Sequence, residues 1–154
     1  RNQMYEEIVS LLGGRVAEAL FLQDISTGAS NDIERATAIA KNMVMKLGMS
    51  DELGPILYGS QHSNDEVFLG RDFASRHNFS ESIAAVIDGE VKNIIDGAYD
   101  KCTAILTEHM DQLHLVAQYL IEHEKVDEIT FIKLMKGEME SACEKLPAYS
   151  HAQN

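Results

Sequence analysis

Residues 26–37 read Ser26-Thr27-Gly28-Ala29-Ser30-Asn31-Asp32-Ile33-Glu34-Arg35-Ala36-Thr37, and here a stretch of small and polar residues runs into a strongly periodic helix. Asp32 lies at that junction. A carboxylate on the first turn of a helix lies among unpaired backbone N–H groups and at the positive end of the helix dipole, so it stays ionised and is held in a narrow range of directions. This suits a metal ligand. It equally suits a plain helix cap, because Ser, Thr, Asp and Asn are the ordinary capping residues, so the spacing alone leaves both interpretations open.

The overall composition limits the classes of protein and partner. The 154 residues are 45% apolar, enough for one compact domain. With 13 basic and 25 acidic side chains the formal charge is −12, which repels phosphates and argues against nucleic acid as a partner. No apolar run approaches the ~20 residues that span a bilayer, and the chain starts at Arg1 without a signal-peptide pattern. We therefore expect a soluble fragment of a longer protein, without membrane contact of its own.

The two cysteines, Cys102 and Cys143, show no C-x-x-C spacing. Two thiols in a chain of this size neither build a disulfide framework nor close a zinc site. Both are expected to be reduced and structural, in a compartment like the cytosol.

Apolar residues recur at helical spacing along most of the chain. The pattern predicts helices at about 4–20, 30–47, 80–109, 111–124 and 128–137. Ser80 and Asp127 are the expected N-caps of the third and fifth helices, and Gly48 is the expected left-handed end of the second. The third helix would reach roughly 45 Å at ~1.5 Å per residue. The inward face of the second helix is predicted to be Ile33, Ala36, Ala40, Met43, Val44 and Leu47.

Glycines interrupt two of the predicted helices. Gly13 and Gly14 cost the first helix roughly 1 kcal/mol each against alanine, so we expect another backbone to pack closely against them. Gly89 and Gly97 stand in the third helix, where better helix formers would be expected.

Between residues 49 and 79 the helical period is lost. Two short apolar runs, 56–58 and 67–69, are separated by a polar stretch and could pair as a small hairpin resting against the helices. The predicted fold is therefore mainly α, a helical bundle-like arrangement with one long helix and a small β-hairpin. We expect residues 1–140 to form one partial domain and residues 141–154 to be a loose C-terminal tail.

Common catalytic signatures are absent from the chain. It has no Gly-rich loop ending in Gly-Lys-Ser/Thr, no G-x-S-x-G and no H-E-x-x-H. The segment 123–127 begins His-Glu, but Asp127 stands in place of the second histidine, so we interpret it as a solvated helix end. His109 and His114 are five residues apart, about 140° around a helix, and do not form a metal-clamping pair. Glu18 and Asp32 remain as candidate carboxylates, and neither can hold zinc without partners that this chain does not contain.

Four stretches carry a resemblance to a known family. They are Leu11-Leu12-Gly13-Gly14-Arg15-Val16-Ala17-Glu18, Ser26-Thr27-Gly28-Ala29-Ser30-Asn31-Asp32-Ile33, Leu53-Gly54-Pro55 and Glu66-Val67-Phe68-Leu69-Gly70-Arg71. In this order and spacing the sequence resembles the C-terminal part of the peptidase domain of the FtsH family, the membrane-anchored, ATP-dependent zinc metalloproteases. The resemblance extends from about Tyr5 to Met135.

The resemblance implies a role for Asp32: the matching aspartate of the family is the third protein ligand of the catalytic zinc. The other two ligands come from an H-E-x-x-H helix upstream of Arg1, which also carries the glutamate that activates the zinc-bound water, so no catalytic residue is expected in this chain. Glu18 is the rival third ligand and would otherwise orient the site. Asn31 is expected to support it similarly, while Thr27 and Gly28 let the loop approach the metal closely.

The family also implies the partners of the whole enzyme. Val67, Phe68 and Leu69 would hold an unfolded polypeptide substrate through backbone hydrogen bonds. The long helix would pack a peptidase domain into a homo-hexamer, and a missing ATPase module would bind ATP and magnesium. The parent would lie at the cytoplasmic face of the bacterial inner membrane, or in an organellar matrix or stroma, and would degrade unfolded or misassembled proteins.

The chain by itself is expected neither to hydrolyse peptides nor to bind stoichiometric zinc, because it lacks the two histidines. One alternative from another class stays open. In it the chain is a non-enzymatic helical module for assembly or interaction, and Asp32 serves only as a helix cap.

Overall fold

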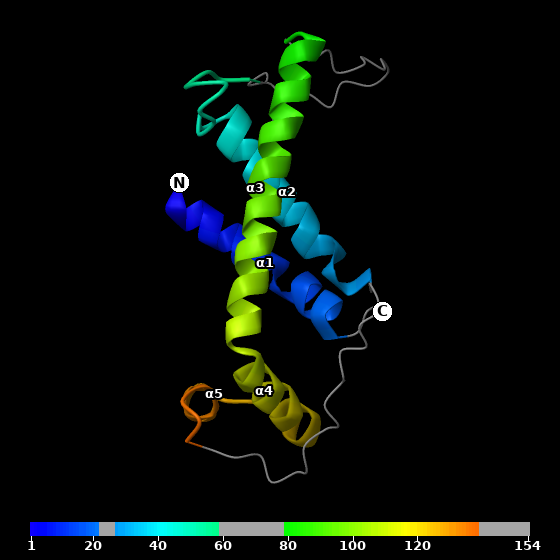
Figure 1. The fold of residues 1–154 in the computed structure, drawn as a ribbon, viewed down its shortest axis with the longest axis vertical. Helices are drawn as coiled ribbons and strands as arrows, with labels where there is room; N and C mark the ends of the chain where they lie inside the picture. The colour runs from blue at the N-terminus through cyan, green and yellow to red at the C-terminus, as the bar shows by residue number, and fades with distance from the viewer. Residues whose placement is uncertain (22–26, 59–78, 139–154) are drawn as a thin grey trace, which may run out of the picture. The chain divides into compact units, whose positions relative to one another are not determined.

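The computed structural model describes residues 1–21, 27–58 and 79–138, and these residues are mainly helical (Figure 1). The mainly α prediction is confirmed, and every predicted helix is present with its ends shifted by no more than two residues. The elements are α1 (Asn2–Phe21), the 3-10 turn η1 (Thr27–Ala29), α2 (Ser30–Met45), α3 (Glu81–Glu108), α4 (Met110–His123) and α5 (Glu128–Met135). No helix in the described ranges is long and apolar enough to cross a bilayer.

The chain divides into two compact units, Arg1–Leu106 and Thr107–Asn154. In the first unit α1 packs against α2, and Figure 1 shows α3 running across both helices. Side chains from all three helices meet in one hydrophobic core. Apolar residues at helical spacing put these side chains on one face of each helix. The buried residues that these helices contribute to the core are Ile8, Val9, Leu12, Val16, Ala36, Ala40, Met43, Val44, Ile87, Val91, Ala98 and Cys102.

Gly97 lies on α3 beside the side chain of Tyr5 from α1. A Cβ at this position would lie 3.2 Å from the hydroxyl oxygen of Tyr5. One turn further along α3, the Nζ of Lys101 donates to Oε1 of Glu6 at 2.5 Å and lies 5.7 Å from the centre of the Tyr5 ring. The glycine that interrupts the helix pattern here therefore makes room for a tyrosine from α1. Gly89 has no such neighbour within 4 Å of its Cβ position.

α2 ends earlier than predicted, at Met45 with Lys46 as its C-cap, but Gly48 has the predicted left-handed conformation. Its φ is +58°, a left-handed conformation that side chains with a Cβ rarely adopt. The N–H of Met49 donates to the carbonyl of Met43 at 2.9 Å as the chain reverses. A Cβ at Gly48 would stand 2.6 Å from the Cα of Pro55, so glycine also permits the following loop to fold back against this turn.

The predicted β-hairpin is not supported, since the described residues contain no strand. Its first arm, 56–58, is irregular chain in which the N–H of Tyr58 donates to the carbonyl of Met45 at 2.7 Å and the N–H of Ile56 to that of Gly54 at 2.9 Å. Backbone groups that bond back to the end of α2 are not free for a strand ladder. The second arm, 67–69, lies outside the described residues, as does the predicted tail at 141–154.

Two expectations about packing are corrected. Ala36, Ala40, Met43 and Val44 form the buried face of α2 as predicted, but Ile33 and Leu47 at its ends are 41% and 51% exposed. The buried stripe therefore ends one turn short on each side. On α1, no described atom outside the helix backbone lies within 4 Å of the Cβ position of Gly13 or Gly14, so the expected close packing is not present among the described residues.

The second unit contains α4 and α5 in contact with each other. The side chain of Asp127 caps α5 by accepting the N–H of Thr130 at 2.7 Å, which confirms the predicted cap. Among the described residues of this unit, only Leu134 is a buried apolar side chain. Ile121 and Ile129 are 77% and 67% exposed, so much of the apolar surface of these two helices faces outward.

Candidate functional site

Asp32 lies in the first turn of α2 as its third residue, and it does not cap the helix. The residue at the N-cap position is Ala29, and no side chain accepts a hydrogen bond there. The capping interpretation of Asp32 is therefore wrong for this structure. Its carboxylate still lies at the positive end of the helix dipole, where negative charge is stabilised. The fold thus places an acid at the helix start without using it to satisfy the backbone.

The surroundings of the Asp32 carboxylate are open. The side chain is 47% exposed, and among the described residues its ion-pair partner is Arg35, one turn further along α2. The Nη1 of Arg35 stands 4.0 Å from Oδ1 of Asp32, and the arginine side chain is 58% exposed. An exposed pair at this spacing is worth about 0.3–0.5 kcal/mol or less. The carboxylate is consequently accessible and only loosely engaged.

The turn η1 connects the surroundings of Asp32 to α1, because it contacts both α1 and α2. Gly28 and Asn31, which flank the start of α2, are both exposed, whereas Ala29 between them is buried. A buried alanine anchors the turn while its neighbours face solvent. The predicted supporting residues Gly28 and Asn31 therefore lie beside Asp32 on an accessible surface. Thr27 begins η1, and its side chain lies outside the described part of the structure.

Glu18, the alternative ligand, lies near the end of α1 and is half-buried. Its Oε2 atom and the Nη1 atom of Arg15, one turn earlier on α1, are both inaccessible to solvent. The sequence pattern did not single out Arg15 as a functional residue. Burial of a polar atom is ordinary only where it is engaged by other groups, so Glu18 has the surroundings of a positioned group and not of an open ligand.

The residues described here do not complete a metal site by themselves. Within residues 1–21, 27–58 and 79–138 no three His, Cys, Asp or Glu side chains are arranged to hold a metal ion. Asp32 and Glu18 come from different helices, and neither has a histidine in such a group. A zinc site that includes Asp32 would need ligands from polypeptide that these residues do not supply.

The segment that imitates a metal motif, 123–127, has structural roles instead. His123 ends α4, where its Nδ1–H donates to the carbonyl of Tyr119 at 3.1 Å and its ring stacks on the tyrosine ring with centroids 4.1 Å apart. Glu124 turns the chain with a φ of +60°. Asp127 is occupied as the cap of α5, and the hydrogen bond from Thr130 lowers the pKa of its carboxyl. This confirms the interpretation of the segment as a helix end.

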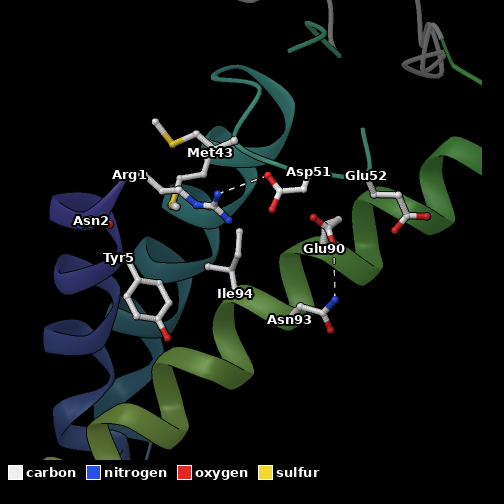
Figure 2. A pocket seen from close by; sticks show the side chains of 10 residues that line it. Arg1, Asn2, Tyr5, Met43, Asp51, Glu52, Glu90, Asn93 and Ile94 are labelled. Atoms are coloured by element: carbon white, nitrogen blue, oxygen red, sulfur yellow. Dashed lines mark hydrogen bonds and ion pairs between the residues drawn. The ribbon is translucent and has the colours of Figure 1, made fainter. Parts of the chain in front are cut away.

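A pocket of about 470 Å³ lies elsewhere in the first unit (Figure 2). Met43 and Ile94 lie on its apolar wall, and Figure 2 shows Arg1 reaching across its mouth toward Asp51, with 3.6 Å between Nη1 and Oδ1. Neither Asp32 nor Glu18 lines it. Its residues come from four separate segments, so no local sequence signal could have indicated it. The complete lining is Arg1, Asn2, Tyr5, Met43, Met49, Asp51, Glu52, Glu90, Asn93 and Ile94.

The pocket holds no arrangement suited to catalysis. Its ion pair is open to solvent: the side chains of Asp51 and Arg1 are 94% and 60% exposed. Glu90 is engaged with Asn93 on the same helix at 3.5 Å. No nucleophile paired with a base lines it, and geometry of that kind is the first requirement of a catalytic site. The candidate chemistry of the chain therefore rests on Asp32. The predicted substrate strand, Val67, Phe68 and Leu69, lies outside the described residues.

Comparison with known proteins gives consistent matches. The sequence model of peptidase family M41 matches residues 1–134. The chain is 54% identical over 138 residues to ATP-dependent zinc metalloprotease FtsH 1 of Thermoanaerobacter sp. (strain X514), covering 90% of this chain and 22% of that protein. It is 48% identical over 127 residues to ATP-dependent zinc metalloprotease FtsH of Bacillus subtilis, covering 82% and 20%. The protein of the same name from Thermotoga maritima is 40% identical over 144 residues, covering 94% and 23%. The chain thus spans about a fifth of the length of these curated relatives.

Proposed function

The chain belongs to peptidase family M41, and we propose that it forms the C-terminal part of the peptidase domain of an ATP-dependent zinc metalloprotease, to which it supplies the zinc ligand Asp32. The observation that carries this proposal is the state of the Asp32 carboxylate. It lies on the first turn of α2, is half exposed, caps nothing and has only a loose ion pair. An exposed acid in the first turn is common on helices, and what sets Asp32 apart is its place in the Thr-Gly-Ala-Ser-Asn-Asp stretch that carries the family resemblance.

The residues present fit a zinc ion, as a part of its site. Carboxylate oxygen is an ordinary zinc donor beside two histidines in peptidase sites. The helix dipole favours the ionised, metal-binding form of Asp32. One carboxylate has too little affinity to hold the ion alone, so the proposal requires two ligands from the parent polypeptide. These would be the two histidines of an H-E-x-x-H helix elsewhere in the parent polypeptide.

When bound, zinc polarises the scissile carbonyl and lowers the pKa of its water toward neutrality. The residues of this chain would bind the zinc ion and hold its ligand in position. Asp32 offers its carboxylate, and η1 fixes the start of α2 by contacting both α1 and α2. Glu18, half-buried on α1, would orient this part of the site through the groups that engage it, in the way outer groups hold metal ligands in place. Gly28 and Asn31 leave the approach to Asp32 open.

The whole protein would use ATP and magnesium in a separate module and cleave unfolded or misassembled polypeptides, held by residues 67–69. It would be anchored in a membrane and act as a homo-hexamer. The exposed apolar side chains of α4 and α5, Ile121 and Ile129 foremost, favour a further role of this chain in assembly. Outward apolar surface of this kind is stabilised when another polypeptide covers it.

The proposal is tested in the intact parent protein by comparing Asp32→Ala with Glu81→Ala. Glu81 is a matched control, because it is likewise an exposed acid in the first turn of a helix. The expected result is that Asp32→Ala loses zinc, from about one per chain to a small fraction, and loses casein cleavage while ATP hydrolysis persists. Glu81→Ala should retain all three. Full zinc content and cleavage in Asp32→Ala would exclude Asp32 as the ligand and leave Glu18 as the candidate, which Glu18→Gln tests; a wild-type protein without zinc and without cleavage would instead favour the assembly module.

A further inference from the structure

We infer that Arg35 is a positioning residue for Asp32 that competes with the metal: its guanidinium engages the carboxylate when zinc is absent and lowers the affinity of the site for the ion. This inference rests on the proposed function of Asp32 as a zinc ligand. The proposed function names the residue that binds zinc. This inference adds that the positive charge of Arg35 controls how tightly zinc binds to it.

The geometry of the pair supports competition over permanent pairing. Nη1 of Arg35 stands 4.0 Å from Oδ1 of Asp32, which is the outer limit of an ion pair and too long for a direct hydrogen bond. Both side chains are about half exposed. The arginine is therefore close enough to attract the carboxylate but is not locked to it by packing or by a bidentate contact. A divalent ion can displace it at little structural cost.

The chemistry of arginine gives the direction of the effect. A guanidinium stays protonated at any physiological pH, so one positive charge always stands one helical turn from the proposed ligand. It lowers the negative potential at the carboxylate and repels an approaching cation. The Arg35 guanidinium also lies near one oxygen, Oδ1, of the carboxylate that would hold the metal. Both effects weaken zinc binding, and both disappear when the charge is removed.

A charge series at position 35 separates this role from a purely structural one. In the intact parent protein, stripped of metal, zinc is titrated against a chromophoric chelator for wild type, Arg35→Lys, Arg35→Gln and Arg35→Glu. We expect the zinc dissociation constant of Arg35→Lys to match wild type. It should fall about twofold in Arg35→Gln and further in Arg35→Glu, as expected for an exposed pair of this strength. High salt should compress the differences.

Lys41 supplies the matched control. It is an exposed cation on the same helix, nine residues beyond Asp32 and so roughly 14 Å along the helix axis. At that separation its charge is largely screened at physiological salt. Lys41→Gln and Lys41→Glu change the net charge as the Arg35 variants do, and both should leave the zinc affinity unchanged. Equal shifts at the two positions would show a general charge effect and overturn the role of Arg35.

Two further outcomes overturn the inference and are told apart by Asp32→Ala in the same titration. If Asp32→Ala loses zinc but the Arg35 series is flat or weakens binding, the proposed ligand stands and only the competition is wrong. If Asp32→Ala binds zinc like wild type, the proposed function fails and the inference fails with it. Thermal unfolding of the metal-free variants is measured alongside the titration. If Arg35 had only a structural role, its substitution would change the stability of the protein and leave the zinc affinity unchanged.

Discussion

The hydroxyl of Tyr5 on α1 lies 3.2 Å from the point where a Cβ at Gly97 on α3 would stand. The contact joins two helices that are far apart in the sequence, and Lys101 reinforces it by bonding Glu6 on the same side of α1. A glycine that would weaken an isolated helix thereby becomes part of the packing between helices. The loss of helix propensity at Gly97 and the contribution of its packing against Tyr5 can be measured separately.

Replacing Gly89 and Gly97 by alanine should have different effects on stability. Gly89→Ala meets no neighbour within 4 Å and should raise the free energy of unfolding by about 0.5–1 kcal/mol, the helix-propensity gain. Gly97→Ala should gain less, because the tyrosine hydroxyl must shift by a few tenths of an ångström. Urea unfolding followed by circular dichroism measures both. In a Tyr5→Phe background the two gains should become equal; a persistent difference would mean that the hydroxyl is not the obstacle.

Gly48→Ala should destabilise the chain strongly. The substitution places a Cβ 2.6 Å from the Cα of Pro55 in addition to forcing alanine into a φ of +58°. We expect a loss of about 2–4 kcal/mol, combining left-handed strain with overpacking. Gly54→Ala is the control, since Gly54 has a φ of +68° but no neighbour within 4 Å. It should lose only the ~1–2 kcal/mol of the left-handed conformation. Equal losses in the two variants would exclude the contact with Pro55.

The cap of α5 should make stability depend on pH in the acid range. The hydrogen bonds from Thr130 lower the pKa of Asp127 in the folded chain, so the folded value lies below the unfolded value of about 3.9. The stabilising contribution is therefore complete above about pH 4–5 and is lost as pH falls through the folded pKa. Melting curves of wild type and Asp127→Ala should differ at pH 7 and converge toward pH 2–3. Asp127→Asn keeps a capping oxygen that does not ionise, so its own contribution should not change with pH, and its small deficit against wild type at pH 7 should close in acid.

Cys102 should react slowly with thiol reagents in the folded chain. It is a free cysteine, 4% exposed, and burial raises the pKa of its thiol. Both effects lower the concentration of accessible thiolate, the reactive form. In a Cys143→Ser background, Ellman's reagent at pH 8 should label Cys102 at least about tenfold more slowly in the folded chain than in urea. Comparable rates in the two conditions would show that this part of the core opens readily.

Local pattern was sufficient for the helices because each one carries its own signal. Apolar spacing located all the α-helices of the described residues, and Asp127 and Gly48 indicated a helix start and a left-handed turn through chemistry confined to a few residues. The end of the buried stripe on α2 could not be predicted in the same way. Ile33 has the right spacing for burial but is 41% exposed, since burial requires a neighbouring element to extend that far.

At the candidate site, too, the sequence predicts the local structure but not the features that depend on tertiary contacts. An aspartate after Ser and Asn predicts a helix start, which is correct, but the pattern does not reveal which residue occupies the N-cap. The backbone of Ala29 decides this by taking the N-cap position itself. The surroundings of Glu18 and Arg15 were equally beyond prediction, because the burial of single polar atoms depends on groups distant in the sequence.

The packing of α2 also determines the direction in which the Asp32 side chain points. Ala36 and Ala40 are fully buried on the face that meets the other helices, and Asp32 precedes Ala36 by one turn, about 40° away around the helix. The packing of the two alanines thus fixes the rotation of α2 about its own axis. A larger side chain at Ala36 would turn the helix about its axis and swing the carboxylate sideways without touching it. Substitutions deep in the core would then change the direction of the Asp32 carboxylate without altering the residue itself.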